Sequence, residues 1–328
     1  MRKSIAIIIT SILVLSGCNK QQSVSDRLLN EVEKAIAINP DSASNLLKGI
    51  SSPEKLDNKT FARWCMLSGK ITDEIFNSIL PTYQLERAYD WYSSHGSPDE
   101  QVQILIYLGR SYFADGDYDK AMSIYTNALD IAEKNKLNNL TGYTYSYIGD
   151  LYGEKFMRTE AIKRYKAAAE CFKKENNTDS YACALRDVGR EYACIDSLSR
   201  ALKILTIADS VARNTKNIEV TASIDNALGN IYAMQNKYDK AEEYFLKALV
   251  GRETMPDYMA LIDLYIASGA INKAQELLSK ILQDNPKYTY SIKYLYYQIY
   301  NEEKNYKEAL TNLKEYVEIT DSIIYADN

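Results

Sequence analysis

The sequence predicts an all-α chain built from repeated helical hairpins, and three observations support this. No proline falls between residues 99 and 255, and proline breaks helix interiors. Gly-x-x-Tyr pairs recur every 40 residues, starting at Gly109, Gly149, Gly189 and Gly229. Each pair is followed at a fixed offset by an Ala-x3-(aromatic or Leu)-x2-Ala pattern, first at Ala121, Tyr125 and Ala128. A unit repeated at constant spacing is typical of a solenoid, in which each unit packs on its neighbours.

The composition excludes several classes of protein. Hydrophobic residues make up 46% and charged residues 25% of the 328 residues, which is typical of a folded chain and excludes wholesale disorder. Asp and Glu number 44 against 39 Lys and Arg, so the net charge is −5. Proteins that bind nucleic-acid backbones usually carry a basic surplus, so we expect no nucleic-acid partner.

The N-terminus is predicted to be a targeting signal. Arg2 and Lys3 precede an apolar run that is far shorter than the ~20 residues of a spanning helix, as in a secretory leader. The Leu-Ser-Gly-Cys sequence at 15–18 resembles the lipobox of bacterial lipoproteins. The resemblance implies a signal peptide over 1–17, cleavage before Cys18, acylation of Cys18 by palmitate-like chains, and a tether over 18–25. A leader with an incidental Cys, cleaved elsewhere, is the alternative.

The lipobox resemblance also implies a location. It places the chain in the cell envelope, bound to a membrane through the lipid anchor and facing the periplasm. Residue 19 is Asn rather than the Asp that retains many Gram-negative lipoproteins in the inner membrane, so we expect the outer membrane.

Residues 26–98 are predicted to form degenerate helical hairpins. Asn39-Pro40-Asp41 separates helices expected over 24–38 and 42–50. A further hairpin is expected over 59–95, with helices at 61–76 and 83–94 and a stop at Gly96.

Residues 102–254 are predicted to be four 40-residue hairpin units. Leu105, Leu108 and Tyr112 share one helical face, and the small residues Gly109 and Ala121 mark a close helix crossing. These positions closely resemble the tetratricopeptide repeat, whose signature is L-G-x2-Y…A-x3-F…P and whose period is 34 residues. The resemblance implies a right-handed superhelical solenoid with longer second helices and loops than usual.

Residues 255–328 are predicted to form two shorter units that end in a capping helix over 306–324. Ile262 stands where the signature has a small residue, which predicts a wider helix crossing. The whole pattern resembles the extracytoplasmic repeat lipoproteins of Bacteroidetes. Some of those proteins continue into signalling modules, and the sequence does not say whether this chain does.

The repeat resemblance also names candidate binding residues. In the family, the residue after the small position of each first helix faces the concave groove. The corresponding series is Arg110, Asp150, Arg190, Asn230, Asp263 and Gln298, and Arg186 and Asn226 lie one turn earlier in two units. We expect this polar stripe to face a protein or peptide partner, with Arg186, Arg190, Asn226 and Asn230 suited to a carboxylate or an extended backbone. Solvation of an open groove would also explain polar residues there.

No pattern for catalysis, a cofactor or a metal site is found. The chain has one histidine, His95, no C-x2-C pair, no phosphate-binding glycine loop and no H-E-x-x-H, so we expect a protein that is not an enzyme. Cys171 and Cys183 are expected either as free thiols or as a disulfide.

Tyrosine is abundant, and its positions differ in meaning. Eleven of the 28 tyrosines occupy signature positions and are expected in the core: Tyr112, Tyr118, Tyr125, Tyr152, Tyr165, Tyr192, Tyr232, Tyr238, Tyr265, Tyr300 and Tyr306. Clusters at 143–147 and 288–300 are expected either to bind a partner or to pack against loops.

The predicted function is an anchored scaffold or sensor for protein–protein interaction. Two alternatives are an outer-membrane assembly lipoprotein and a nutrient- or glycan-binding lipoprotein, the latter usually built around Trp-lined platforms. Trp64 and Trp91 both fall in the degenerate N-terminal hairpin.

Overall fold

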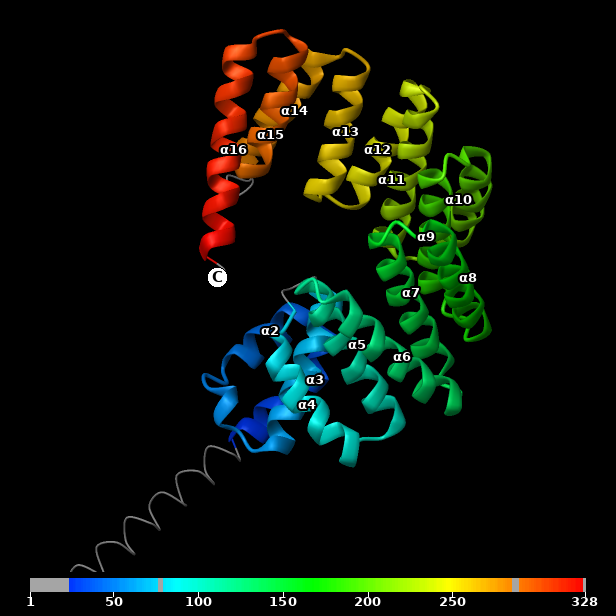
Figure 1. Ribbon diagram of the computed structural model, residues 1–328, viewed down its shortest axis with the longest axis vertical. Helices are drawn as coiled ribbons and strands as arrows, with labels where there is room; N and C mark the ends of the chain where they lie inside the picture. The colour runs from blue at the N-terminus through cyan, green and yellow to red at the C-terminus, as the bar shows by residue number, and fades with distance from the viewer. Residues whose placement is uncertain (1–23, 76–78, 285–288, 327–328) are drawn as a thin grey trace, which may run out of the picture. The chain divides into compact units, whose positions relative to one another are not determined.

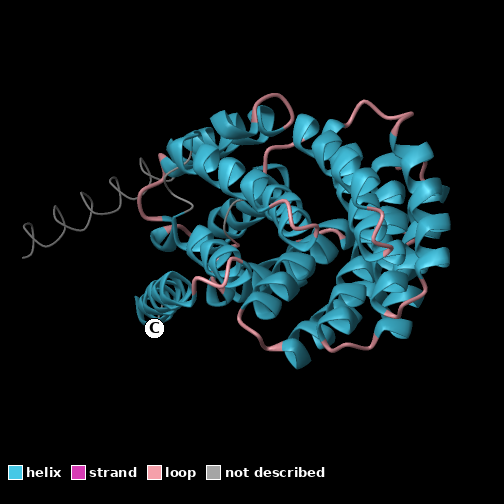
Figure 2. Ribbon diagram, turned by 90° about the horizontal axis from the view of Figure 1, so that it is seen from above, coloured by secondary structure: helices cyan, strands magenta, loops and turns pink. Residues whose placement is uncertain are grey.

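The computed structural model describes residues 24–75, 79–284 and 289–326, and within these ranges every regular element is a helix (Figures 1 and 2). The predicted all-α repeat solenoid is confirmed. The chain divides into two compact units, which meet between Glu175 and Asn176. This division falls inside the predicted four-repeat segment, and no break in the repeat pattern marks it. None of the described helices combines the length and apolarity that crossing a membrane requires.

The first unit is a series of helical hairpins. Helical residues 24–36 come first and are followed by α2 (Pro40–Lys48), a short 3-10 helix (Pro53–Lys55), α3 (Asn58–Ile75), α4 (Thr82–His95), α5 (Pro98–Ala114), α6 (Tyr118–Lys134), α7 (Asn138–Glu154) and α8 (Arg158–Lys174). The predicted start of α2 at residue 42 is wrong by two residues. Asn39 caps the helix by accepting a hydrogen bond from the Ser42 backbone N–H at 2.9 Å, and Pro40 suits the first turn.

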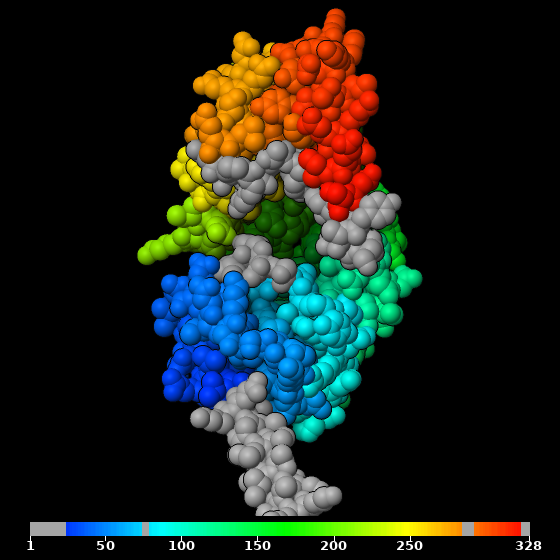
Figure 3. All heavy atoms as spheres, turned by 90° about the vertical axis from the view of Figure 1, so that its left-hand side faces the viewer, coloured from blue at the N-terminus to red at the C-terminus, as the bar shows by residue number. Residues whose placement is uncertain are grey.

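The second unit repeats the same plan. It contains α9 (Thr178–Cys194), α10 (Leu198–Ala212), α11 (Ile218–Met234), α12 (Tyr238–Gly251), α13 (Met255–Ala267), α14 (Ile271–Asp284), α15 (Thr289–Glu302) and α16 (Tyr306–Ala326). The last helix, red in Figure 3, presents one side at the surface of this unit.

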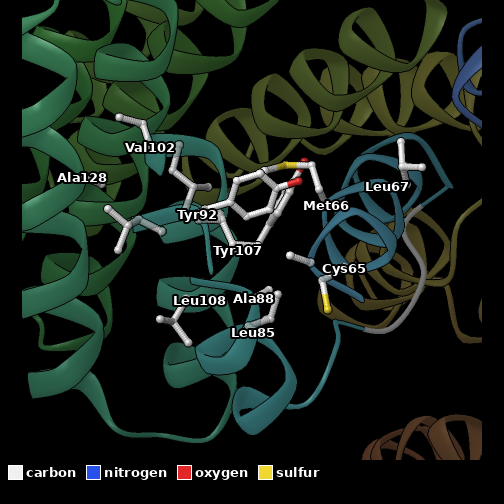
Figure 4. Close-up of a cluster of buried hydrophobic side chains, with 14 of the residues drawn as sticks. Cys65, Met66, Leu67, Leu85, Ala88, Tyr92, Val102, Tyr107, Leu108 and Ala128 are labelled. Atoms are coloured by element: carbon white, nitrogen blue, oxygen red, sulfur yellow. The ribbon is translucent and has the colours of Figure 1, made fainter. Parts of the chain in front are cut away.

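The buried core of the first unit runs from Leu29 to Leu151, and one part of it lies among α3, α4 and α5. Buried side chains from α3, α4 and α5 converge there, including Cys65, Leu85, Tyr92 and Leu108 (Figure 4). Burial raises the pKa of the Cys65 thiol, which therefore stays protonated and behaves as a small apolar group. The thiols of Cys171 and Cys183 are both free, so the structure contains no disulfide between them.

The signature glycines lie where the two helices of a hairpin cross, as predicted. A Cβ atom placed on Gly229 would lie 2.6 Å from the ring of Phe245, and one on Gly149 would lie 2.7 Å from the ring of Tyr165. Both rings are buried, so they have no free space into which to move.

Gly229→Ala is therefore expected to destabilise the second unit by about 1–2 kcal/mol, because overpacking outweighs the ~1 kcal/mol by which alanine favours a helix. Urea unfolding of the two proteins measures the difference. In a Phe245→Ala background the ring is gone, and the same glycine substitution should be neutral or stabilising. An equal penalty in both backgrounds would contradict the steric explanation.

Each of the six hairpin turns from α5–α6 to α15–α16 contains one residue with positive φ. The angles are 76° at Gly116, 57° at Phe156, 56° at Asp196, 57° at Asn236, 75° at Gly269 and 58° at Lys304. This left-handed conformation ends the first helix and reverses the chain. Phe156 is the bulkiest of the six, and its side chain is exposed.

Of the eleven signature tyrosines expected in the core, four are buried and six are half-buried, and Tyr306 is exposed, which corrects its prediction. Its exposed fraction is 64%, whereas Tyr112, Tyr125 and Tyr165 are buried. Tyr118, at the equivalent place in an earlier hairpin, packs against Phe113 with ring centroids 5.4 Å apart. Asn301 occupies the matching position before Tyr306, and its polar side chain offers no apolar surface for the ring.

Candidate functional site

In the second unit, predicted groove residues form a connected polar row across the first helices α9, α11 and α13. On α9, Arg186 Nη1 donates to Ser223 Oγ of α11 at 3.0 Å. One turn further along α11, Asn226 Nδ2 donates to Asp257 Oδ1 of α13 at 2.8 Å. Asn230 Nδ2 in turn donates to Asn226 Oδ1 at 3.0 Å. Hydrogen bonds between side chains therefore fix Arg186, Asn226 and Asn230, and we call these three residues and Arg190, one turn further along α9, the polar row.

The members of the polar row differ in what they leave free. Arg186 is 22% exposed, and its Nε and Nη2 atoms also contact the Asp187 carboxylate at 2.9 and 3.1 Å. Asn226 is half-buried and engaged with Asp257. Arg190, in contrast, is 66% exposed, and its Nη1 atom lies 3.9 Å from Asp187 Oδ1. Arg190 therefore presents its guanidinium donors to solvent. Asn230 uses its Nδ2 group on Asn226 O and Oδ1, both at 3.0 Å, so it presents its Oδ1 acceptor.

Asp257 is the residue that sequence reasoning missed in this region. Its side chain is fully buried and accepts from Arg252 Nε and Nη2 at 2.9 and 3.0 Å and from Thr254 Oγ1 at 2.5 Å, besides Asn226. The available signal was the Thr254-x-x-Asp257 start of a helix, which resembles a capping box. A buried carboxylate is stable only when it is paired and fully hydrogen-bonded. Asp257 meets this condition, and it anchors the polar row through Asn226.

In the first unit, Arg110 lies in a cluster of α3, α5 and α7 side chains. Its Nη1 forms an ion pair with Asp73 Oδ1, and Tyr107 Oη donates to Asp73 Oδ2 at 3.0 Å. Burial and the Asp73 carboxylate raise the pKa of Tyr107, so its hydroxyl remains a donor. The Arg110 guanidinium lies 5.5 Å from the centroid of the Tyr147 ring, within cation–π range.

This cluster borders a cavity of about 630 Å³ within the first unit, which we call the α3–α5–α7 cavity. It is lined by Ile36, Lys70, Thr72, Asp73, Ile79, Gln103, Ile106, Tyr107, Arg110, Tyr143 and Tyr147. Sequence reasoning placed Arg110 and Tyr143–Tyr147 among the candidates but had no signal for Lys70 or Asp73, which lie in the degenerate hairpin.

The other predicted groove residues have separate environments. Asp150 on α7 accepts from Tyr165 Oη of α8 at 2.6 Å, within one hairpin. Asp263 lies on the surface of α13, where partial desolvation raises the pKa of its carboxyl. Gln298 on α15 is half-buried, and within the described residues its Oε1 atom has no hydrogen-bond partner. The structure thus joins four of the eight candidates in the polar row.

The tyrosine-rich segment at 288–300 is only partly described. Tyr294 is 38% exposed and packs against Tyr297 and Tyr316, with ring centroids 5.7 and 5.4 Å apart. The side chains of Tyr288 and Tyr290 lie outside the described residues.

A second hollow, of about 850 Å³, lies among α12, α13 and α14 of the second unit. Leu246, Val250 and Leu277 give it an apolar floor, and two lysines and two glutamates border it, so its rim has no net charge. The wider crossing predicted from Ile262 falls in this hairpin.

Two segments match models of one repeat family. Residues 100–174 and residues 221–255 both match the tetratricopeptide repeat. A search of curated protein sequences finds no match.

Solved structures of low sequence identity share the fold. The crystal structure of Rap protein complexed with competence and sporulation factor matches with a TM-score of 0.69 and 18% identity, over 93% of this chain and 88% of the other. Aspartyl phosphate phosphatase F from Bacillus subtilis matches at 0.60 and 14%, over 91% and 94%. NprR in complex with its cognate peptide NprX matches at 0.56 and 14%, over 88% and 87%. The chain therefore carries tetratricopeptide repeats at residues 100–174 and 221–255, within an all-α helical-repeat solenoid.

Proposed function

We propose that this protein is a scaffold or sensor that binds a protein or peptide along the first helices of its hairpins. The polar row carries this proposal. Side-chain hydrogen bonds hold Arg186, Asn226 and Asn230 in place before any partner arrives, which lowers the entropic cost of binding. Exposed Arg190 then offers donors to a carboxylate or to the carbonyl groups of an extended backbone, and Asn230 Oδ1 can accept from a backbone N–H.

The fold likeness supports a peptide partner. Among the similar structures, NprR was solved in complex with its cognate peptide NprX, and Rap protein was solved in complex with competence and sporulation factor. A glycan partner has less support, because neither tryptophan forms an open platform. Trp64 stacks on Phe61 with ring centroids 6.0 Å apart, and Trp91 stacks on His95 with ring centroids 5.0 Å apart. The second contact packs the single histidine against Trp91.

The proposed site of action is the cell envelope. The lipobox-like ending at Cys18 supports a lipid anchor, as in extracytoplasmic repeat lipoproteins of Bacteroidetes. Such an anchor would keep the polar row in the periplasm, with the outer membrane as the expected attachment.

Arg190→Glu tests the proposed binding surface. Because Arg190 is exposed and makes one long contact, the variant should keep its helicity and melting temperature while partner binding falls at least about tenfold. Photo-crosslinking from position 230 in living cells, followed by mass spectrometry, identifies the partner, and calorimetry with that partner measures the loss.

The matched control is Lys203→Glu, which makes the same charge change on an exposed position of α10, the second helix of that hairpin. It should leave partner binding unchanged. A folded Arg190→Glu protein that binds as well as the Lys203→Glu protein would refute the proposal.

A further inference from the structure

The α3–α5–α7 cavity has the dimensions and walls of a small-molecule site. Its volume of about 630 Å³ lies in the range of about 300–1,000 Å³ that is usual for such pockets. Three isoleucines, Ile36, Ile79 and Ile106, supply apolar surface, and three tyrosines supply aromatic surface. All of these residues belong to the first unit, so the cavity is a separate site from the polar row.

Among the charged groups that line the cavity, the acceptors are already engaged and donors remain free. Both oxygens of Asp73, the lone carboxylate of the lining, are already engaged, Oδ1 by Arg110 and Oδ2 by Tyr107. In the described part of the chain no hydrogen bond uses Lys70 Nζ, Arg110 Nε or Arg110 Nη2, and all three can only donate. The lining therefore offers donors to a ligand that brings acceptors.

The charges of the lining point the same way. Lys70 and Arg110 are cationic, and Asp73 is the one anion among the eleven lining residues that the structure describes, so these residues carry a surplus of one positive charge. A ligand with a single negative charge neutralises that surplus. Because charge-assisted hydrogen bonds from Lys70 and Arg110 are stronger than neutral ones, the complex with an anion is favoured over the complex with a neutral analogue.

The wall beside Arg110 is fixed in advance. The Tyr147 ring stacks on Tyr125 with centroids 5.7 Å apart and an interplanar angle of 15°, and the Arg110 guanidinium approaches the Tyr147 ring. Asp73 then holds Arg110 from α3. A guanidinium restrained by both a carboxylate and an aromatic ring loses little freedom when a ligand binds.

We propose that the α3–α5–α7 cavity binds a small hydrophobic carboxylate. Its apolar body lies against Ile36, Ile79 and Ile106, and its carboxylate accepts hydrogen bonds from Lys70 and Arg110. This is a second binding site, and it does not depend on the polar row, so the two proposals fail independently.

Ligand-detected NMR and calorimetry on the full chain test the proposal. The probes are hexanoate and phenylacetate, together with their neutral analogues hexanamide and phenylacetamide. At least one acid should bind saturably and about tenfold or more tighter than its amide, as expected when a charge-assisted hydrogen bond is lost. Lys70→Gln should weaken the acid several-fold and leave the amide unchanged, with the remaining preference for the acid supplied by Arg110. Lys70 is exposed, so its loss leaves the fold intact.

Two further variants separate the site from general charge effects. Lys134→Gln removes an exposed lysine from α6 that does not line the cavity, and it should change nothing. Ile36→Trp fills the cavity and should abolish binding of acid and amide alike, while circular dichroism shows retained helicity.

Three results would overturn the proposal. The first is that neither acid binds saturably at millimolar concentration. The second is that acid and amide bind equally well, and the third is that the Lys70 and Lys134 variants bind the acid alike. A tetrapeptide ending in phenylalanine tests whether the cavity instead binds the C-terminus of a peptide. If it binds through Lys70 much more tightly than phenylacetate does, the cavity is a peptide subsite and the small-molecule assignment is wrong.

Discussion

Replacing Arg252 with methionine is expected to lower the free energy of unfolding of the second unit by about 3 kcal/mol. The substitution keeps an unbranched apolar stem but removes the guanidinium, which leaves Asp257 buried without a counter-charge. Thr254 and Asn226 still donate to that carboxylate, so the loss is expected to be below the largest values for broken buried pairs. The thermal midpoint of a unit of this size should fall by about 6–12 °C.

The exposed pair Lys247–Glu243 provides the control in a neighbouring helix. Its side chains are 46% and 60% exposed, so Lys247→Met should change stability by less than about 0.5 kcal/mol. The double variant Arg252→Met, Asp257→Leu should recover part of the loss, because no buried charge remains. Equal, small effects of both single methionine substitutions in a thermal melt would show that Asp257 is not the anchor described above.

Replacing Cys18 with alanine is expected to release the protein from the membrane. If Cys18 is acylated, each buried CH₂ contributes ~0.8 kcal/mol, and two or more chains make a stable anchor. Detergent phase partitioning should therefore place the native protein in the detergent phase and the Cys18→Ala protein in the aqueous phase. Mass spectrometry of the N-terminal peptide should show the acyl chains on residue 18 of the native protein.

Cys194→Ala is the matched control, since it removes an exposed thiol at the end of α9 and should leave partitioning unchanged. A Cys18→Ala protein that stays in the detergent phase would show that another segment holds the membrane.

The repeat pattern predicted the hairpins because its residues are those that pack together where the two helices of a hairpin cross. Gly229 and Phe245 face each other across one crossing, and both sit at fixed offsets in every unit, so a single sequence shows the constraint four times. The right-handed superhelical path implied by the repeat resemblance stays a prediction.

The candidate sites were less predictable because their partners come from outside the repeated positions. Arg110 was named from the stripe, yet its carboxylate partner Asp73 lies in the degenerate hairpin, where no pattern gives its orientation. Asp257 likewise holds Asn226 through a helix start that differs from the 40-residue units. Such pairings depend on where whole helices are placed, and spacing along one helix does not encode them.

The hairpin turns have a consequence for how this chain can change over time. Six turns reach nearly the same left-handed geometry with glycine, aspartate, asparagine, lysine and even phenylalanine at the reversal point. The reversal is thus imposed by the helices on either side, and the residue at the bend adapts to it. A hairpin can accordingly be duplicated, lost or exchanged between related chains as a cassette, leaving its exposed bend to accumulate new side chains.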